Sequence, residues 1–298
     1  MTHRALRRFQ TDINRLIDRR SDSATHALFD GLVNEIRQTA YAAGNSRNAI
    51  VYVDRAIRAA LSLGQGRLVS ALILDIKRIA EEAALEGARR AQHTFEHLDG
   101  AIPPALTNEV LIQEKARIRA RADADDLKTN FGPVLVAALV TVVNASFVKA
   151  EQEKLSRDDT LREAVESLRT QKYIVDRAAK WHASHAYNAV QGDIFQAVWP
   201  QVPDLMKRWT EHVNDIGNRP LDKRVAPDSL AMHGQLAFPN QTFVMPPDPK
   251  VPADLHGMQW SHPPNRPNDR AVVTPWRPLW GVPGWIWRDG RKMRFKVQ

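Results

Sequence analysis

The chain has no cysteine among its 298 residues. Without cysteine it can form no disulfide, no thiolate metal site and no cysteine nucleophile. Disulfide-stapled folds, zinc ribbons and cysteine hydrolases are therefore excluded as classes. The absence is compatible with a reducing compartment, and equally with an assembly that is stabilised by contacts between proteins.

Glycine is also sparse, with 14 residues scattered along the chain. No GxxxxGK[ST] loop, GxGxxG fingerprint or GxSxG elbow occurs. These motifs place backbone N–H groups on phosphates or expose a nucleophilic serine. Nucleotide hydrolysis, dinucleotide binding and a local hydrolase triad therefore have no support in the sequence, and we expect no cofactor.

The chain lacks a secretory signal and a long apolar run. Its basic N-terminal segment is followed by neither an apolar region nor a small-residue cleavage site, so we expect the protein to stay where it is made. The most apolar run, Val134 to Val148, is shorter than the roughly 20 residues that cross a bilayer, and it contains Asn144. We expect a buried helix there and no membrane span.

Proline and tryptophan are rare until the last third of the chain. Of the 18 prolines 15 lie from Pro200 onward, as do six of the eight tryptophans. This shift predicts a boundary near Trp199, with a body over residues 1–198 and a C-terminal module over residues 199–298. Because the module is rich in turn-forming residues and short apolar stretches, we expect a small, loop-rich α+β domain there.

Apolar residues ahead of the boundary recur every three or four positions, as in Leu68, Leu72, Ile76 and Ile79. This spacing is typical of amphipathic helices, so the fold class is mainly α, with a helical N-terminal body. Helices are predicted over residues 4–20, 25–43, 47–63, 67–97, 107–126, 133–155 and 158–197, and short strands within 235–245 and 271–274.

Histidines are the first candidates for chemistry. His182 and His185 could share one face of a helix, but zinc needs three or four converging ligands and no short, fixed ligand spacing occurs. We therefore expect structural or surface histidines and no metal site. An alternative is a metal-dependent nuclease, in which His233 is the base, Asn240 orients it, and His256 or His262 binds the metal.

Tryptophan and basic residues interleave in the last 29 residues. From Arg270 onward there are seven basic residues and one acid, Asp289, against a net charge of +8 for the whole chain. Such a tail suits protein docking, nucleic-acid contact or plain local packing. As a docking tail, the part after Thr274 should be removable without loss of the helical fold. The interface candidates are Trp276, Trp280, Trp285 and Trp287, and the DNA-contact candidates are Arg288, Arg291, Lys292, Arg294 and Lys296.

Several short motifs follow one another in order between about residues 179 and 275. They are ASHAYNA at 183–189, KRW at 207–209, Asp215, Arg219-Pro220, Arg224, SLAMHGQ at 229–235, Phe243, Pro246-Pro247 and a closing stretch at 262–271. In this order and spacing they resemble the C-terminal domain of the Mu F-like phage head morphogenesis proteins, the minor head proteins of tailed bacteriophages. The two cysteines of the family's closing motif are absent here, so no cysteine- or metal-dependent role is carried over.

The resemblance implies a structural minor head protein, made in the host cytoplasm and present in several copies inside the phage head or at the portal vertex of the virion. It would act in head assembly, or in DNA packaging and ejection, by binding portal or major capsid protein. Packaged double-stranded DNA is a further expected partner, which suits a basic chain. A cellular DNA-binding protein unrelated to phage is a third hypothesis.

No catalytic residue is carried over from the family, so we expect a protein that is not an enzyme. Five motif residues are instead expected to hold the fold or an interface. Gly234 suits a turn with positive φ, and His233 and Gln235 can bond loop backbones. The other two are Trp209 and Arg224.

Overall fold

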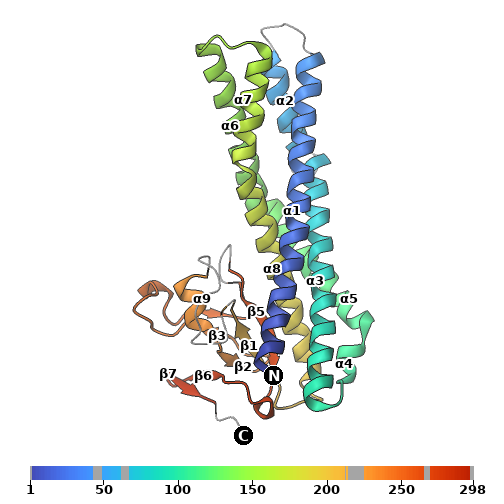
Figure 1. The fold of residues 1–298 in the computed structure, drawn as a ribbon, viewed down its shortest axis with the longest axis vertical. Coiled ribbons are helices and arrows are strands. Elements are labelled where there is room, and N and C mark those ends of the chain that lie inside the picture. Colours follow the sequence, from blue (N-terminus) through green and yellow to red (C-terminus); the bar gives the residue numbers. More distant parts are fainter. Residues whose placement is uncertain are drawn as a thin grey trace. The chain divides into compact units, whose positions relative to one another are not determined.

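The computed structural model describes residues 2–42, 49–61, 67–211, 213, 225–264 and 269–295 (Figure 1). The described chain is mainly helical, and its strands are short and confined to the C-terminal third, which confirms the predicted fold class. The long helices are α1 (Thr2–Ala42), α2 (Ala49–Leu61), α3 (Arg67–Asp99), α5 (Glu109–Asp126), α6 (Gly132–Gln152), α7 (Arg157–Thr170) and α8 (Lys172–Val198). Shorter ones are α4 (Pro104–Thr107) and α9 (Pro227–Met232), and the five-residue π-helix Leu127–Phe131 precedes α6.

Two helix boundaries differ from the sequence prediction. A break was expected between residues 20 and 25, but α1 is continuous there because Ser21, Ala24 and Leu28 share a buried face at helical spacing. Residues 158–197 were expected to form one helix, and they form α7 and α8 instead. The two helices are separated at Gln171, whose backbone N–H bonds to the Leu168 carbonyl in a tightened last turn.

By its contacts the chain falls into two compact units. The first, here named the mixed unit, comprises Met1–Asp18, Ile79–Ala122 and Lys180–Gln298. The second, the helical unit, comprises Arg19–Arg78 and Asp123–Ala179. The last long helix ends at Val198, beside the boundary expected near Trp199, but the segment that follows belongs to the same unit as parts of α1, α3, α5 and α8.

Helix α6 is the central apolar element of the helical unit. Among the described residues it is the only helix long and apolar enough to cross a membrane, with a mean hydropathy of 1.8 in its most apolar window. In the structure it packs against α7 and α2, and 39% of that window is buried, including Leu139, Val143 and Phe147. The core helices of soluble proteins pass the same test, so a single helix of this kind is weak evidence for a membrane span.

Helices of the mixed unit approach one another through small residues. Ala80 of α3, Ala120 of α5 and Ala186 of α8 form one buried cluster. A Cβ atom at Gly87 of α3 would lie 2.5 Å from the side chains of Tyr187 and Gln191 on α8. A larger residue at Gly87 would therefore separate the two helices.

The sheet of the mixed unit is built around β1 (Met206–Thr210), which pairs antiparallel with β2 (Leu236–Ala237) and β5 (Val272–Trp276). Asn188 of α8 binds β5 as a neighbouring strand would: its Nδ2 donates to the Ala271 carbonyl over 3.3 Å, and its Oδ1 accepts from the Val273 N–H over 2.7 Å. Gln10 and Asn14 of α1 both donate to the Arg270 carbonyl, over 3.0 and 2.9 Å. These bonds fix the sheet to two helices, α8 and α1.

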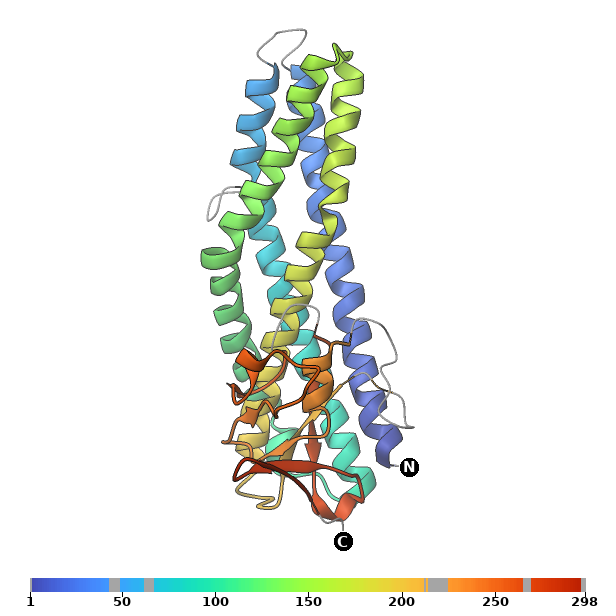
Figure 2. The same cartoon turned by 90° about the vertical axis from the view of Figure 1, so that its left-hand side faces the viewer.

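Two further strand pairs complete the mixed unit: β3 (Phe243–Val244) with β4 (Gln259–Trp260), and β6 (Trp285–Arg288) with β7 (Arg291–Arg294). The β6–β7 pair is a hairpin, drawn in red in Figure 2. The predicted strand regions contain β2, β3 and most of β5, whereas β1, β4 and the hairpin were not predicted.

Candidate functional site

The KRW motif is the central strand of the sheet. Trp209 is fully buried, and its ring meets that of Phe243 edge to face, with centroids 5.4 Å apart. Both aromatic residues belong to the motif order described above, and here they form one contact. The KRW and Phe243 elements therefore have a packing role.

The turn at residues 233–235 joins three strands. Gly234 has a φ of +80°, which only glycine adopts without strain, and its N–H bonds to the Trp209 carbonyl of β1. The side chain of Gln235 makes two bonds to the backbone of Val244 in β3, one as donor over 2.8 Å and one as acceptor over 2.7 Å. The indole N–H of Trp285 in β6 donates to the His233 carbonyl over 2.9 Å. The turn residues are thus used to connect β1, β3 and β6.

A buried polar cluster lies beside this turn. His233 Nδ1 accepts the backbone N–H of Glu211 over 3.1 Å, so this nitrogen carries a lone pair and is not free to act as a base. The Ser229 hydroxyl lies between two carboxylates, Oε2 of Glu211 and Oδ1 of Asp269, the latter at 2.8 Å. Asp269 also accepts the Ala271 N–H over 2.9 Å, which links the cluster to the residue preceding β5. Sequence reasoning missed Glu211, Ser229 and Asp269 as a group, because 18 and 40 residues separate the partners.

Two basic residues of β1 are buried. Lys207 donates to the Ser261 carbonyl over 2.7 Å, and its ammonium lies 5.2 Å from the centroid of the Phe243 ring. Burial lowers the pKa of Lys207 to about 8 and that of Arg208 to about 10. Arg208 donates to Thr210 Oγ1 over 3.1 Å. Within the described chain neither cation has a carboxylate at ion-pair distance.

The histidines are dispersed over several small contacts. His185 stacks on Trp181 and meets His262 at a centroid distance of 4.7 Å. Burial, followed by the charge of His185, lowers the pKa of His262 to about 4. His182 is buried, and His256 contacts the backbone of Asp248. The described residues contain no group of three or more histidines and carboxylates able to hold a metal ion.

The four residues of the nuclease alternative, His233, Asn240, His256 and His262, do not form one site in the described chain. His233 is buried and bonded to the backbone, whereas Asn240 is exposed on the loop between β2 and β3. His256 and His262 contact different partners. Within the described residues, these four side chains make no hydrogen bond or ring contact with one another.

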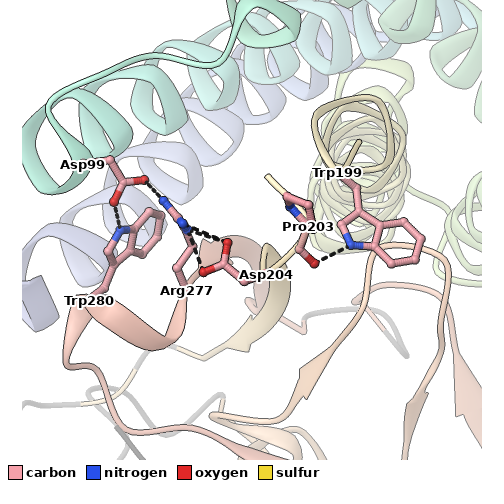
Figure 3. A network of polar contacts seen from close by, with 6 residues as sticks. All are labelled: Asp99, Trp199, Pro203, Asp204, Arg277 and Trp280. Atoms are coloured by element: carbon pink, nitrogen blue, oxygen red, sulfur yellow. Dashed lines mark hydrogen bonds and ion pairs between the residues drawn. The ribbon is translucent and has the colours of Figure 1, made fainter. Parts of the chain in front are cut away.

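A polar network fastens the C-terminal segment to the end of α3 (Figure 3). The Arg277 guanidinium donates to Asp99 over 2.6 Å and to Asp204 over 3.0 Å, and the Trp280 indole N–H donates to the other oxygen of Asp99 over 2.6 Å. Burial alone would lower the pKa of Arg277, but the hydrogen bonds and charges of Asp204 and Asp99 raise it. Arg277 is therefore a permanently charged bridge between two segments that are distant in the sequence.

Most of the tail tryptophans are buried in the mixed unit and are not available at the surface. Trp276, Trp280 and Trp285 are buried, and each donates its indole N–H to a neighbouring oxygen. Trp287 is half-buried on the hairpin. The basic candidates of the hairpin, Arg288, Arg291, Lys292 and Arg294, are exposed. Arg224 and Lys296 lie outside the described residues, as do Asp215 and Arg219 of the motif order.

No family model, curated protein or solved structure matches this chain. The likeness to the Mu F-like proteins thus depends on the order of the motifs alone.

Proposed function

We propose that this chain is a structural minor head protein of a tailed bacteriophage, of the Mu F-like type. In this proposal it acts in head assembly, or in DNA packaging and ejection, near the portal vertex. It binds portal or major capsid protein and packaged double-stranded DNA, has no catalytic role of its own, and is present in several copies in each virion.

One observation carries the proposal. Several of the motif residues that carry the resemblance contact one another within the mixed unit, although tens of residues separate them in the sequence. Trp209 packs on Phe243, and Gly234 and Gln235 bond to β1 and β3 through their backbone and side chain. This favours a scaffold function for the motifs, because Trp209 is fully buried and the polar groups of Gly234 and Gln235 are occupied by backbone partners.

The nuclease alternative is supported less well. A general base must reach a substrate proton with a free lone pair. His233 Nδ1 is already bonded to the Glu211 N–H, and His233 is 6% exposed. The base that the sequence suggested is therefore engaged in the fold.

The decisive experiment is co-expression of the chain with the portal and major capsid proteins of its phage, followed by affinity purification and by analysis of purified heads. We expect the chain to bind one of these proteins and to be present in heads in several copies. Its absence from heads, together with no binding to either protein, would overturn the proposal.

A plasmid-cleavage assay with added magnesium or zinc tests the alternative. We expect no cleavage above a metal-free control. Cleavage that is lost in His233→Gln, with the unfolding midpoint unchanged, would replace the structural role with an enzymatic one.

A further inference from the structure

Four basic side chains lie close together on the β6–β7 hairpin. Arg288, Arg291, Lys292 and Arg294 are all exposed in a segment of seven residues. The one acid in the hairpin, Asp289, lies 3.6 Å from Arg288, and both side chains are largely in solvent. No ion pair is formed by the other three cations within the described chain. The hairpin therefore presents a net positive charge that the protein itself does not neutralise.

The strand register sets like charges against each other. Arg288 of β6 is paired directly with Arg291 of β7. Like charges at directly opposed positions destabilise a strand pair. Burial, followed by the charge of Arg294, lowers the pKa of Lys292. A hairpin that holds cations this close in the free protein gains stability when a polyanion covers it.

The hairpin is nevertheless firmly built. Asp289 and Gly290 have φ values of 52° and 69°, the two positive values of a type I′ turn, which matches the twist of paired strands. At the other end Trp285 is buried, and Ile286 and Phe295 pack against the core cluster of the sheet. The base is thus anchored, and the cations lie towards the turn and along β7.

We propose that the β6–β7 hairpin is the element that contacts DNA, and that it binds the phosphates of duplex DNA independently of base sequence. The inference rests on the proposed function only in taking packaged DNA as the natural polyanion. It assigns the contact to Arg288, Arg291, Lys292 and Arg294, and it excludes stacking by the buried tail tryptophans.

Charge density favours duplex DNA as the partner. A four-residue strand extends about 13 Å at about 3.3 Å per residue. Over that length duplex DNA presents roughly eight phosphates, at about one for each 1.7 Å of axis. The register and the alternation of side chains place Arg288 and Arg291 on one face of the hairpin and Lys292 and Arg294 on the other, so the phosphates along the duplex outnumber the cations of either face. Exposed apolar area is small on the hairpin, where Met293 is the large hydrophobic residue at the surface, so a membrane or an apolar protein surface fits it less well.

The salt dependence of DNA binding tests the inference. The purified full chain is titrated against a dye-labelled duplex of mixed sequence at a series of sodium chloride concentrations, with fluorescence anisotropy as the readout. The variant R288Q/R291Q/R294Q should bind more weakly, and its plot of log K against log salt should be shallower by about 0.9 for each removed cation that contacts a phosphate, and so by up to about 2.7. Lys292 is kept, because its ammonium lies 4.3 Å from the centroid of the Trp285 ring.

Two controls separate a hairpin contact from general charge and from misfolding. The variant R37Q/R55Q/R177Q removes three exposed arginines of the helical unit, with the same change in net charge. It should leave the slope unchanged. The variant R288K/R291K/R294K should restore the wild-type slope, because lysine also binds phosphate as a point charge. If both glutamine variants lower the slope equally, or if neither does, the hairpin contact is overturned.

The outcomes also distinguish this inference from the proposed function. A hairpin variant that binds duplex as the wild type does but no longer binds portal or capsid protein would make the hairpin a protein-docking element and overturn the DNA contact alone. Duplex binding through the hairpin by a chain that never enters heads would leave this inference standing and overturn the proposed function.

Discussion

At the scale of single residues, the pair of buried cations on β1 is unfavourable for folding. Lys207 and Arg208 are 2% and 3% exposed, and both bond to neutral oxygens. Moving a charge from water into a protein interior is unfavourable unless an opposite charge compensates it. The sheet therefore holds these side chains against a free-energy cost, and that cost should depend on pH.

Lys207 should make the protein more stable in mildly alkaline solution. Its pKa is about 8 in the folded chain and about 10.5 when exposed, so between these values the unfolded chain binds more protons than the folded one. Stability then rises with pH from about 8. At about 1.4 kcal/mol for each pKa unit, the full penalty below pH 8 is at most about 3.5 kcal/mol. Denaturant unfolding at pH 7, 8, 9 and about 10 measures it.

The variant Lys207→Met should be more stable than the wild type at pH 7 and should lose most of the rise between about pH 8 and 10. Lys250→Met, at an exposed position, is the matched control and should keep the rise. The range stops at pH 10, because burial raises the pKa of Tyr187 well above 10 and stability falls with pH beyond that point. A wild-type curve that is flat between pH 8 and 10 would contradict the assignment.

The contrast between Gly234 and Ser229 shows which site residues can be predicted from the sequence. Gly234 and Gln235 act through a local turn, and their residue types indicate that use. Ser229 acquires its role only from Glu211 and Asp269, which the fold brings in from other segments. Sequence spacing carries no information on such contacts.

At the scale of elements, helices were predicted better than strands because most long helices bury one face only. Strand β1 is buried at all five positions and contains Lys207 and Arg208, so it shows neither alternation nor a continuous apolar run. The Asp289-Gly290 pair between two short segments is a sequence signal for a hairpin. The basic residues around it were instead interpreted as a charged tail. These two misses come from charged residues in strands, whereas β4 was missed because two residues are too short to show a period.

The turn glycine of the hairpin should control local rather than global stability. Gly290 has a φ of 69°, with open space around the position of a Cβ atom. In Gly290→Ala the left-handed backbone should cost about 1–2 kcal/mol. Because β6 and β7 pair with no other strand of the described chain beyond Trp285, we expect faster hydrogen exchange of β6 and β7 amides with little change in the unfolding midpoint.

The matched control is Gly192→Ala in α8, where a Cβ atom also meets open space but φ is not positive. There alanine should stabilise the protein by about 0.4–1 kcal/mol. If Gly290→Ala leaves exchange in the hairpin unchanged, the turn does not hold the strands, and the preformed cation array inferred above loses its basis.

At the scale of the whole molecule, the C-terminal third is built into the mixed unit. Asn188 of α8 binds β5, and Gln10 and Asn14 of α1 bind the Arg270 carbonyl. At the end of α3, Asp99 binds both Arg277 and Trp280. The proline and tryptophan content sets this region apart because it is rich in loops and turns. Which segments fold together depends instead on the contacts between them, and these join the region to α1, α3 and α8.

Two truncations should separate the core part of the tail from its surface part. Ending the chain after Thr274 removes Trp276, Arg277 and Trp280. Each buried tryptophan is worth roughly 3–5 kcal/mol, whereas a whole domain is stable by about 5–15 kcal/mol. We therefore expect the mixed unit to lose cooperative unfolding and become protease-sensitive, contrary to the expectation that a tail beyond Thr274 is dispensable.

Ending the chain after Gly284 keeps those three residues and removes the hairpin. It also removes Trp285, Ile286 and Phe295, so the unfolding midpoint should fall while the transition stays cooperative. Thermal unfolding followed by circular dichroism, with limited proteolysis of both truncated chains, gives the comparison. Equal behaviour of the two would mean that the contacts of Arg277 and Trp280 with Asp99 do not hold the segment, and the tail would again be a separable docking element. If the chain that ends at Gly284 unfolds cooperatively and yet fails to bind DNA, the tail residues that stabilise the mixed unit lie before residue 285, and those that bind DNA lie from residue 285 onward.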